Sequence, residues 1–575
     1  MHNDPEPTFR ACLESVVQRY KSLILLTPLR QEERSRIAKV PQTRLNATLR
    51  LSFKTASYSG ASPSCSNARV RPWWERRNIL LVLLLIGLTP LLWPALPPLS
   101  DLPGHMGRWH IAISISRSAA LASYYTFTWA PVGNLGMDLL VPALTAVIPF
   151  ETAVKLCVII IPALTMAGLI WTALEVHGRI PSTILFALPF AYAWPFQFGF
   201  VNFTLAQGLA FCVLAFWIRL GRYKRLILRA AVFVPISLGL WLAHSFGWGM
   251  FCLMAIGAEL ARLRVEGRTW LTTLLTAAVQ SMPLALPLTF LISTSSGQNS
   301  GADDWFDWAA KGVWVASILR DRWETFDIAS LIPVFVILYG AARDSKLGFS
   351  ALLGWPALLC LVAFIILPRL ALGGAYVDMR IAPAVVMLGL LAIQPSKGSV
   401  RFGQIIAALA VTFFLVRTGA TTTSFVFRAA EQQRELDAIS SIPHGASVLS
   451  LVSRPCNGVW SDLRRDHLPG MAIVRRDIFT NEQWALEGQQ LLRIRYSPAA
   501  PYLADPSQLV YPSACPDIGS RFNTALRQFP RDGFSHVWTI GFPPNLMPLL
   551  DLQLIWTNGG SALYQVRHQT KAESL

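Results

Sequence analysis

The chain contains about eleven separate apolar stretches that each approach 20 residues, divided by polar segments. About 20 helical residues cross a hydrocarbon core of about 30 Å. A helix also satisfies its backbone N–H and C=O groups internally, as lipid requires. The sequence therefore predicts an α-helical polytopic membrane protein. We expect helices near residues 78–95, 153–174, 181–198, 203–219, 229–243, 246–262, 270–292, 328–342, 349–368, 379–394 and 402–420.

Positive charges between the apolar stretches predict the orientation. With the basic N-terminal segment placed inside, the short inner loops hold 13 Lys and Arg, which is the positive-inside pattern. The net charge of +17 is therefore attributed to topology and to anionic lipid rather than to nucleic acid. A further apolar segment, 133–150, would move the basic loop 219–225 outside if it crossed the membrane. We assign it to one long outer loop, 100–152, with helices expected near 103–122 and 135–149.

Composition divides the chain into three parts. Residues 1–77 hold 14 Lys and Arg against 6 Asp and Glu and lack a signal-peptide pattern, which predicts a cytoplasmic, largely disordered basic extension. Residues 78–427 are expected to form the transmembrane domain, with the long first outer loop and a Trp-rich outer loop at 294–327. Residues 428–575 contain short β-branched and aromatic segments such as "FSHVWTIGF", which predict a small extramembrane α/β domain on the outer, periplasmic side.

Acidic residues concentrate at the expected outer face. Of the 14 Asp and Glu between residues 78 and 427, ten fall on that side and four at inner helix ends. Ion-coupled transporters usually keep ionisable groups near the middle of the membrane. The distribution therefore favours chemistry at the outer face of a bacterial inner membrane.

The segment "DLPGHMGR", 101–108, follows the first apolar stretch directly. A helix starting near its proline would place His105 and Arg108 on one face, with Asp101 at its entry. One interpretation is structural, because Asp is a good N-cap and Pro suits a first turn. The other is catalytic, because a carboxylate can accept a proton and a fixed Arg can stabilise a phosphate.

This segment resembles the acidic motif in the first outer loop of the GT-C class of membrane glycosyltransferases. The likeness extends over residues 78–575 to the long first outer loop with two helices, about eleven spans and the C-terminal outer domain. "FGFVNFTLAQGLA" (198–210), "LAHSFGW" (242–248) and "YVDMRIAPA" (376–384) are similar to segments of bacterial proteins of this type. The resemblance implies an inverting sugar transfer from a polyprenyl-phosphate donor to an acceptor, with Asp101 as general base.

Other residues at the outer edge could complete such a site. Under the resemblance, His105 and Arg108 orient Asp101 or face the donor phosphate. The further substrate or phosphate candidates are Asn202, His244, Asp378 and Arg380. The structural alternatives are a helix cap for the Asn, an interfacial His, and an ion pair between the last two.

The outer loop at 297–327 is acidic and Trp-rich. Its aromatic rings are typical of an interfacial belt, and flat rings also stack on sugars, so the loop is an alternative acceptor site. Its carboxylates give no complete ligand set for a divalent cation, so no metal is predicted. No nucleotide-binding motif occurs, so no cofactor is predicted. The acceptor candidates are Asp303, Asp304, Trp305, Asp307 and Trp308.

Cys456 and Cys515 are the only cysteines of the outer domain. In an oxidising compartment they are expected to form a disulfide, the alternative being two unpaired thiols.

Three functions remain open from the sequence. The first is the glycosyltransferase, whose partners would be a polyprenyl-phosphate-linked sugar, membrane lipid and a glycan or lipid acceptor. The second is a transporter or flippase of lipid-linked glycans, which the scarcity of charge within the spans disfavours. The third is a non-catalytic membrane protein of envelope assembly.

Overall fold

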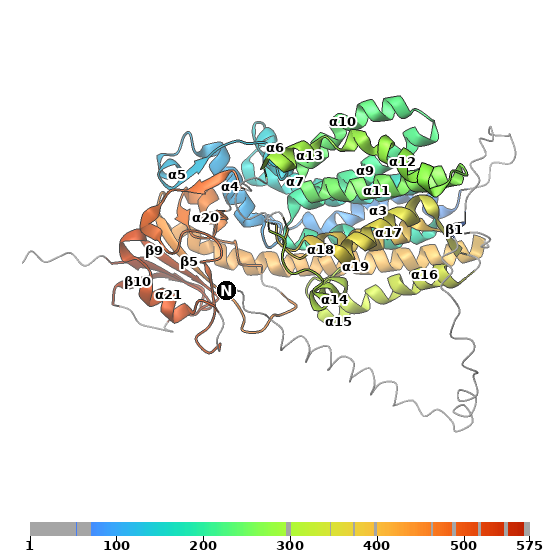
Figure 1. Cartoon of the computed structure of the whole chain (residues 1–575). Helices are drawn as coiled ribbons and strands as arrows, with labels where there is room; N and C mark the ends of the chain where they lie inside the picture. Colours follow the sequence, from blue (N-terminus) through green and yellow to red (C-terminus); the bar gives the residue numbers. More distant parts are fainter. Residues whose placement is uncertain are drawn as a thin grey trace, which may run out of the picture.

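Apolar helices account for most of the chain before residue 437, and a mixed sheet lies beyond them (Figure 1). This computed structural model describes residues 53–54, 71–294, 301–344, 347–371, 374–395, 400–461, 464–485, 490–515, 519–544 and 550–567. Most of the predicted basic extension, 1–77, lies outside the described residues.

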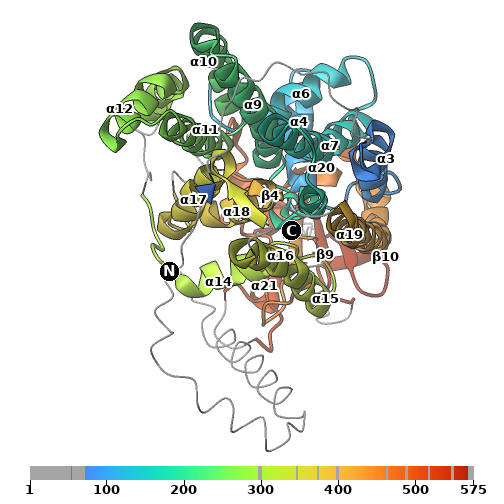
Figure 2. The same cartoon turned by 90° about the vertical axis from the view of Figure 1, so that its right-hand side faces the viewer.

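Six helical segments of the described chain are long and apolar enough to cross a membrane. Three shorter apolar helices accompany them, so the multi-pass helical fold is confirmed, while the count of eleven spans and the orientation stay predictions. Figure 2 views the bundle end-on, with α10 and α12 at its periphery and α18 near its middle. The long segments are α7 (Phe150–His177), α9 (Val201–Arg222), α10 (Leu226–Ala243), α11 (Ser245–Val265), α15 with α16 (Glu324–Ala329 and Leu331–Arg343) and α19 (Val400–Leu436). The shorter helices are α3 (Arg77–Gly87), α6 (Gly136–Thr145) and α17 (Ala351–Ile366), and α18 (Val377–Ala392) packs among them.

Two expected spans are interrupted at prolines. The span expected at 181–198 is a 3-10 helix, η4 (Ser182–Tyr192), followed by the short α8 (Trp194–Phe198). The span expected at 270–292 is divided into α12 (Trp270–Ser281), η5 (Met282–Leu284) and α13 (Pro287–Thr294). Proline lacks an amide hydrogen and clashes with the preceding turn, which explains both interruptions.

The first long loop is tied to the C-terminal domain. Its expected helix at 103–122 is divided into α4 (Leu102–Ser114) and α5 (Ala119–Tyr124), because Ser118 starts a new helix by accepting from the amide of Leu121 (3.3 Å). Strand β2 (Tyr125–Phe127) then pairs antiparallel with β7 (Leu492–Ile494) of the C-terminal domain.

The C-terminal domain is built on a six-stranded mixed sheet, which confirms the predicted α/β fold. Five strands follow the order β10-β11-β9-β5-β6, and the sixth, β8, also pairs with β5. This places β5 (Ser447–Ser453) inside the sheet, where its Val and Leu side chains are buried. Cys456, after β5, is joined by a disulfide to Cys515, with their Cα atoms 5.3 Å apart. The other elements are α20 (Gly470–Arg476), β6 (Phe479–Thr480), β8 (Leu509–Val510), α21 (Phe522–Gln528), β9 (His536–Ile540), β10 (Leu552–Thr557) and β11 (Ala562–Val566).

Helix α19 joins the two parts without a break. It has 37 residues and runs past the predicted domain boundary at 427 into the C-terminal domain (Figure 1). At the opposite end of the bundle, three short strands form a small sheet in the order β1-β3-β4. They are β1 (Phe53–Lys54), β3 (Leu347–Ser350) and β4 (Ile393–Pro395). We call the end of the bundle that contacts the C-terminal domain the domain end.

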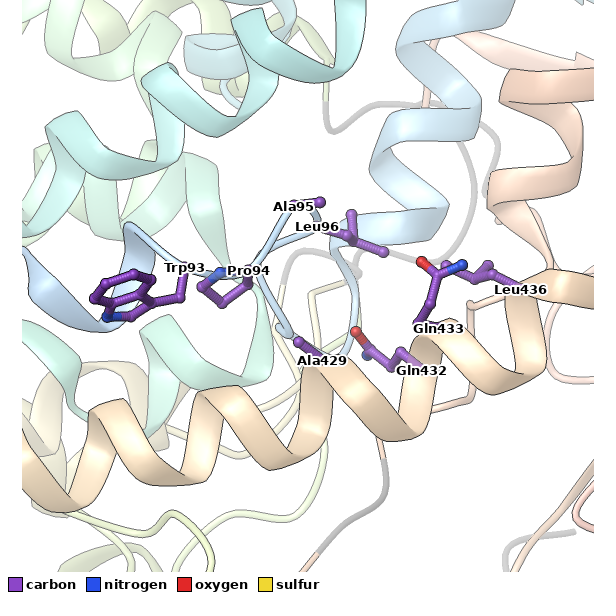
Figure 3. A pocket seen from close by; sticks show the side chains of 8 residues that line it. All are labelled: Trp93, Pro94, Ala95, Leu96, Ala429, Gln432, Gln433 and Leu436. Atoms are coloured by element: carbon purple, nitrogen blue, oxygen red, sulfur yellow. The ribbon is translucent and has the colours of Figure 1, made fainter.

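A cavity of about 210 Å³ lies at the domain end between α19 and the segment after α3 (Figure 3). None of the site residues predicted from the sequence lines this cavity. Its lining residues are Trp93, Pro94, Ala95, Leu96, Ala429, Gln432, Gln433 and Leu436.

Candidate functional site

Asp101 occupies the N-terminus of α4 but does not cap it. Its amide donates to the carbonyl of Phe198 (2.9 Å), and its carbonyl accepts from the amide of His105 (3.1 Å). The carboxylate accepts no hydrogen bond from the first turn, whereas a capping Asp would accept one there. Among the described residues it has no hydrogen-bond or ion-pair partner. The geometry thus does not support the helix-cap interpretation.

The segment before α9 lies directly against Asp101. Gly199 has a φ of +103°, and a Cβ at this position would be 2.7 Å from the amide nitrogen of Asp101. Only glycine tolerates both the conformation and the close approach. The motif "FGFVNF" therefore lies beside "DLPGHMGR", although the two are about a hundred residues apart.

Charges from several elements act on the Asp101 carboxyl. Burial raises its pKa to about 7, the positive charge of His467 opposes this rise, Asp466 and Asp505 add to it, and Arg380 opposes it. An aspartate with a pKa near 7 is partly ionised at neutral pH and can accept a proton there.

Arg380 is a buried cation without a counter-ion in the described chain. It lies in the first turn of α18, with its guanidinium 4.0 Å from the ring centroid of Phe200. Its Nη1 lies 2.9 Å from Nε2 of His244, and its Nη2 donates to the carbonyl of Ala375 (3.2 Å). Its Nε has no partner. A buried guanidinium left with free hydrogen-bond capacity can bind an anion.

His244 stands between two donors. It precedes α11, and its Nδ1 accepts from the amide of Phe246 (3.1 Å), while its Nε2 faces Arg380. A neutral imidazole has only one acceptor nitrogen, so it cannot accept from both donors at once. If Nδ1 accepts from Phe246, Nε2 cannot also accept a hydrogen bond from Arg380.

Asp378 does not neutralise Arg380, although the two lie on the same turn. Its carboxylate pairs with Nζ of Lys311 (3.1 Å), which extends from α14 (Trp308–Ala316). Lys311 also donates to the carbonyls of Phe364 and Leu367. The alternative of an Asp378–Arg380 ion pair is therefore not what the structure contains.

Arg108 and Asn202 both point to Asp138 on α6. Arg108 forms a buried ion pair with Asp138 (2.9 Å) and also bonds to Gln490 of the C-terminal domain. Asn202 donates to Asp138 (3.1 Å) and accepts from the amide of Met137 (2.6 Å). These contacts attach the first long loop to α9. Their proposed role toward a phosphate stays a prediction.

The acceptor candidates gather at the start of α14. Asp307 caps this helix by accepting from the amide of Ala310 (2.9 Å), and Asp304 lies 3.9 Å from Arg369. Trp305 and Trp308 expose more than half of their surface. The amide of Asp303 donates to the carbonyl of Leu370 (3.1 Å). An exposed pair of rings fits both an interfacial belt and a sugar-binding surface, so the acceptor role stays a prediction.

Sequence reasoning missed the residues that the C-terminal domain places beside α4. His467 is buried and paired through Nδ1 with Glu482 (3.0 Å). The Trp484 ring lies 4.2 Å from the His467 ring and 4.9 Å from that of His105. Burial keeps the pKa of His105 well below its usual value, and its Nδ1 has no partner. The one signal was the polar run "NEQW" directly after β6. We call Asp101, His105, His244 and Arg380 the open cluster.

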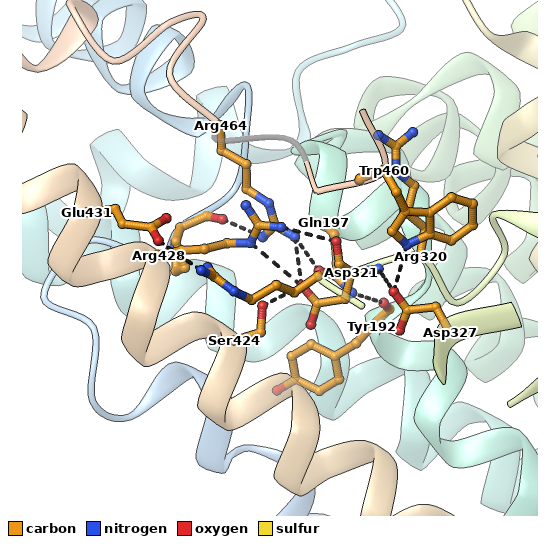
Figure 4. A network of polar contacts seen from close by, with 12 residues as sticks. Tyr192, Gln197, Arg320, Asp321, Asp327, Ser424, Arg428, Glu431, Trp460 and Arg464 are labelled. Atoms are coloured by element: carbon orange, nitrogen blue, oxygen red, sulfur yellow. Dashed lines mark hydrogen bonds and ion pairs between the residues drawn. The ribbon is translucent and has the colours of Figure 1, made fainter. Parts of the chain in front are cut away.

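A second polar cluster borders the first, and each of its charged side chains has a partner of opposite charge (Figure 4). Asp321 accepts from Ser424 (2.6 Å) and pairs with Arg464 (3.2 Å). Arg464 also donates to Gln197, whose carbonyl accepts from the amide of Ser100, next to Asp101. We call Asp321, Asp327, Arg417, Arg428 and Arg464 the paired cluster.

No protein-family model matches the chain, and no curated protein matches it. The solved structures that match the chain include two crystal structures of ArnT from Cupriavidus metallidurans, one bound to undecaprenyl phosphate and one in the apo state. Both have a TM-score of 0.44 and 12% sequence identity to this chain. The matches cover 85% and 84% of this chain and 96% of the ArnT chain. A likeness at that TM-score does not assign a function, which must come from the residues of the chain itself.

Proposed function

We propose that the protein is a membrane glycosyltransferase that transfers a sugar from a polyprenyl-phosphate donor to an acceptor hydroxyl, with Asp101 as general base. The observation that carries this proposal is the Asp101 carboxylate. It lies at a helix N-terminus without capping it and has no partner in the described chain.

The reaction uses the unsatisfied groups of the open cluster. The acceptor oxygen attacks the anomeric carbon, its proton passes to Asp101, and the bond from that carbon to the phosphate oxygen breaks. The leaving phosphate keeps the electron pair of the broken bond. A base with a pKa near the working pH is most effective in this role.

Arg380 is the proposed partner of the donor phosphate. Its guanidinium is buried, lacks a carboxylate partner in the described chain and has a free Nε. The planar fork of a guanidinium matches two oxygens of a phosphate, and the bond strengthens in a poorly hydrated site. The apolar stretches of the chain contain few charged residues, which suits the polyprenyl chain of the donor, because that chain requires an apolar environment.

The test is Asp101→Asn, with Asp551→Asn as a matched control. Asp551 forms a partly exposed ion pair with Arg531 in the C-terminal domain and takes no part in the open cluster. We expect Asp101→Asn to fold, insert and lose transfer by about 100-fold or more, because the amide cannot accept the proton. Release of polyprenyl phosphate from labelled lipid-linked sugars measures transfer in detergent.

The same variants can be scored by complementation of a deletion strain, with surface glycans as the readout. Full complementation by Asp101→Asn at matched protein level would refute the general-base assignment. Loss of function in Asp551→Asn as well would mean that the assay reports folding instead of chemistry.

A further inference from the structure

The C-terminal domain packs closely against the N-terminal half of α4, and three glycines make this contact possible. A Cβ on Gly104 would lie 2.9 Å from the Trp484 ring, and one on Gly107 would lie 2.7 Å from Nε2 of Gln483. A Cβ on Gly470 of α20 would lie 2.4 Å from the carbonyl oxygen of Pro103. Any larger residue would separate the two elements. The close approach places residues of the C-terminal domain beside Asp101.

A direct hydrogen bond fixes the register of this contact. Gln483 donates through Nε2 to the carbonyl of Gly104 (2.9 Å), across 379 positions of sequence. The carbonyl of Gln483 in turn accepts from the amide of Asp505 (3.0 Å). The loop that carries Glu482 and Trp484 is thus held on both sides.

His467 and Glu482 form a buried ion pair in this contact. Nδ1 of His467 lies 3.0 Å from the Glu482 carboxylate, and both side chains are buried. Nε2 of His467 lies 3.8 Å from the Asp505 carboxylate. Burying such a pair costs desolvation energy that an apolar contact would not cost. Neither proton transfer to Asp101 nor phosphate binding by Arg380 accounts for the presence of this pair.

We infer that the C-terminal domain completes the catalytic centre, with His467, held by Glu482 and packed through Trp484 against α4, as a positioning residue that acts on Asp101 through its charge. This inference rests on the proposed role of Asp101. The ring of Trp484, between His105 and His467, fixes the distance between α4 and His467. The C-terminal domain is then part of the active site, and not a separate module attached to it.

The charge of His467 sets the direction in which it shifts the pKa of Asp101. Burial lowers the pKa of His467, but its hydrogen bond to Glu482 and the charges of Asp505 and Asp101 raise it to about 10. The imidazole therefore carries a positive charge at neutral pH. Of the charges that act on Asp101, that of His467 has the largest effect, ahead of Asp466, Asp505 and Arg380. Removing it must raise the pKa of Asp101 above about 7.

The experiment follows the protonation of Asp101 directly, by infrared pH titration of the purified full-length protein. The carboxylic-acid C=O band that disappears in Asp101→Asn identifies the residue. In His467→Asn we expect its midpoint to move up by about 1 pH unit or more. Glu482→Gln keeps the shape of the pair and lowers the pKa of His467, so it should move the midpoint in the same direction.

The matched control is His536→Asn, which removes another buried histidine of the same domain, on β9. It should leave the Asp101 midpoint where it is. An unchanged midpoint in both His467→Asn and Glu482→Gln overturns the inference and leaves the proposed function intact. Failure of the proposed function shows instead as full complementation by Asp101→Asn, and the titration still decides whether His467 and Asp101 are coupled.

Discussion

The open cluster and the paired cluster are neighbours with opposite electrostatics. In the paired cluster, Asp327 accepts from Arg417 (2.7 Å) and from Trp460 (2.8 Å), and Asp321 is shared by Arg428 and Arg464. In the open cluster, the described chain offers no partner to the carboxylate of Asp101 and no counter-ion to Arg380. The two clusters meet through Gln197.

This difference in pairing indicates a structural role for the paired cluster and a catalytic role for the open cluster. Buried charges that each have a partner of opposite charge hold elements together, here α19, the loop before α15 and the C-terminal domain. Buried charges without partners lower stability, and folds retain them where a ligand or a reaction supplies the missing partner. The comparison therefore predicts that substitutions in the paired cluster affect stability and those in the open cluster affect activity.

The largest effect is expected from Asp321→Ala, which breaks the paired cluster. Arg428 and Arg464 would keep their charges in a buried site without their carboxylate, and losing one partner of a buried pair costs about 3–5 kcal/mol. Thermal unfolding in detergent should show a clear loss of stability. Asp101→Ala, measured in parallel, should lower the stability little. Equal losses of stability in the two variants would contradict the proposed difference between the clusters.

Arg380→Gln should weaken donor binding with little loss of stability. A hydrogen bond to a charged group contributes about 1.5–3 kcal/mol, so we expect the affinity for polyprenyl phosphate to fall by about 10- to 100-fold. Arg108→Gln provides the contrast, because it removes the cation that pairs with the buried Asp138 and should mainly lower the unfolding temperature. Isothermal titration and thermal unfolding of both variants measure the two effects. If instead Arg108→Gln lowers the affinity for polyprenyl phosphate and Arg380→Gln lowers the unfolding temperature, Arg108 is the phosphate ligand.

Transfer should depend on pH through Asp101. Burial raises the pKa of its carboxyl to about 7, and only the ionised form can accept the proton. Below that pH, kcat/KM should therefore fall by about tenfold per pH unit. The profile is measured from about pH 5 to 8 with protein stability recorded at each point. Constant activity over the acidic half of this range would contradict the assignment of Asp101 as the base.

The smallest effect compares two aspartates at helix N-termini. Asp307 caps α14, so Asp307→Ala should cost about 1 kcal/mol of stability. Asp101 caps nothing, and its raised pKa means that the ionised carboxyl favours the unfolded chain above about pH 4. Asp101→Ala removes no capping hydrogen bond, so its free energy of unfolding at neutral pH should not fall below that of the unchanged protein. A loss as large as that of Asp307→Ala would restore the cap interpretation.

Local sequence patterns predicted most of the fold. Apolar stretches indicated the positions of α7, α9, α10, α11 and α17 to within a few residues, and β-branched segments indicated β5, β9, β10 and β11. Two expected spans are broken next to prolines 195 and 283, because the length of an apolar stretch does not report where its hydrogen bonds are interrupted.

The site was less accessible to sequence reasoning. Asp101, His244 and Arg380 stood out as charged or polar groups at the ends of apolar stretches. His467 and Glu482 lie in a domain where polar residues are common, so their pattern is not unusual. Only the packing of α20 and the loop after it on α4 brings them to Asp101. Likewise, no local pattern distinguishes Arg108, with its Asp138 partner, from Arg380.

Because α19 is continuous, it constrains where residues can be inserted into or deleted from this chain. At about 1.5 Å per residue its 37 residues extend for about 55 Å, from the bundle through the paired cluster to Glu435, which pairs with Arg465. One residue inserted into this helix would turn everything beyond it by about 100° and advance it by about 1.5 Å. His467 would then face away from α4. Insertions and deletions that a surface loop absorbs should therefore abolish function anywhere along this helix.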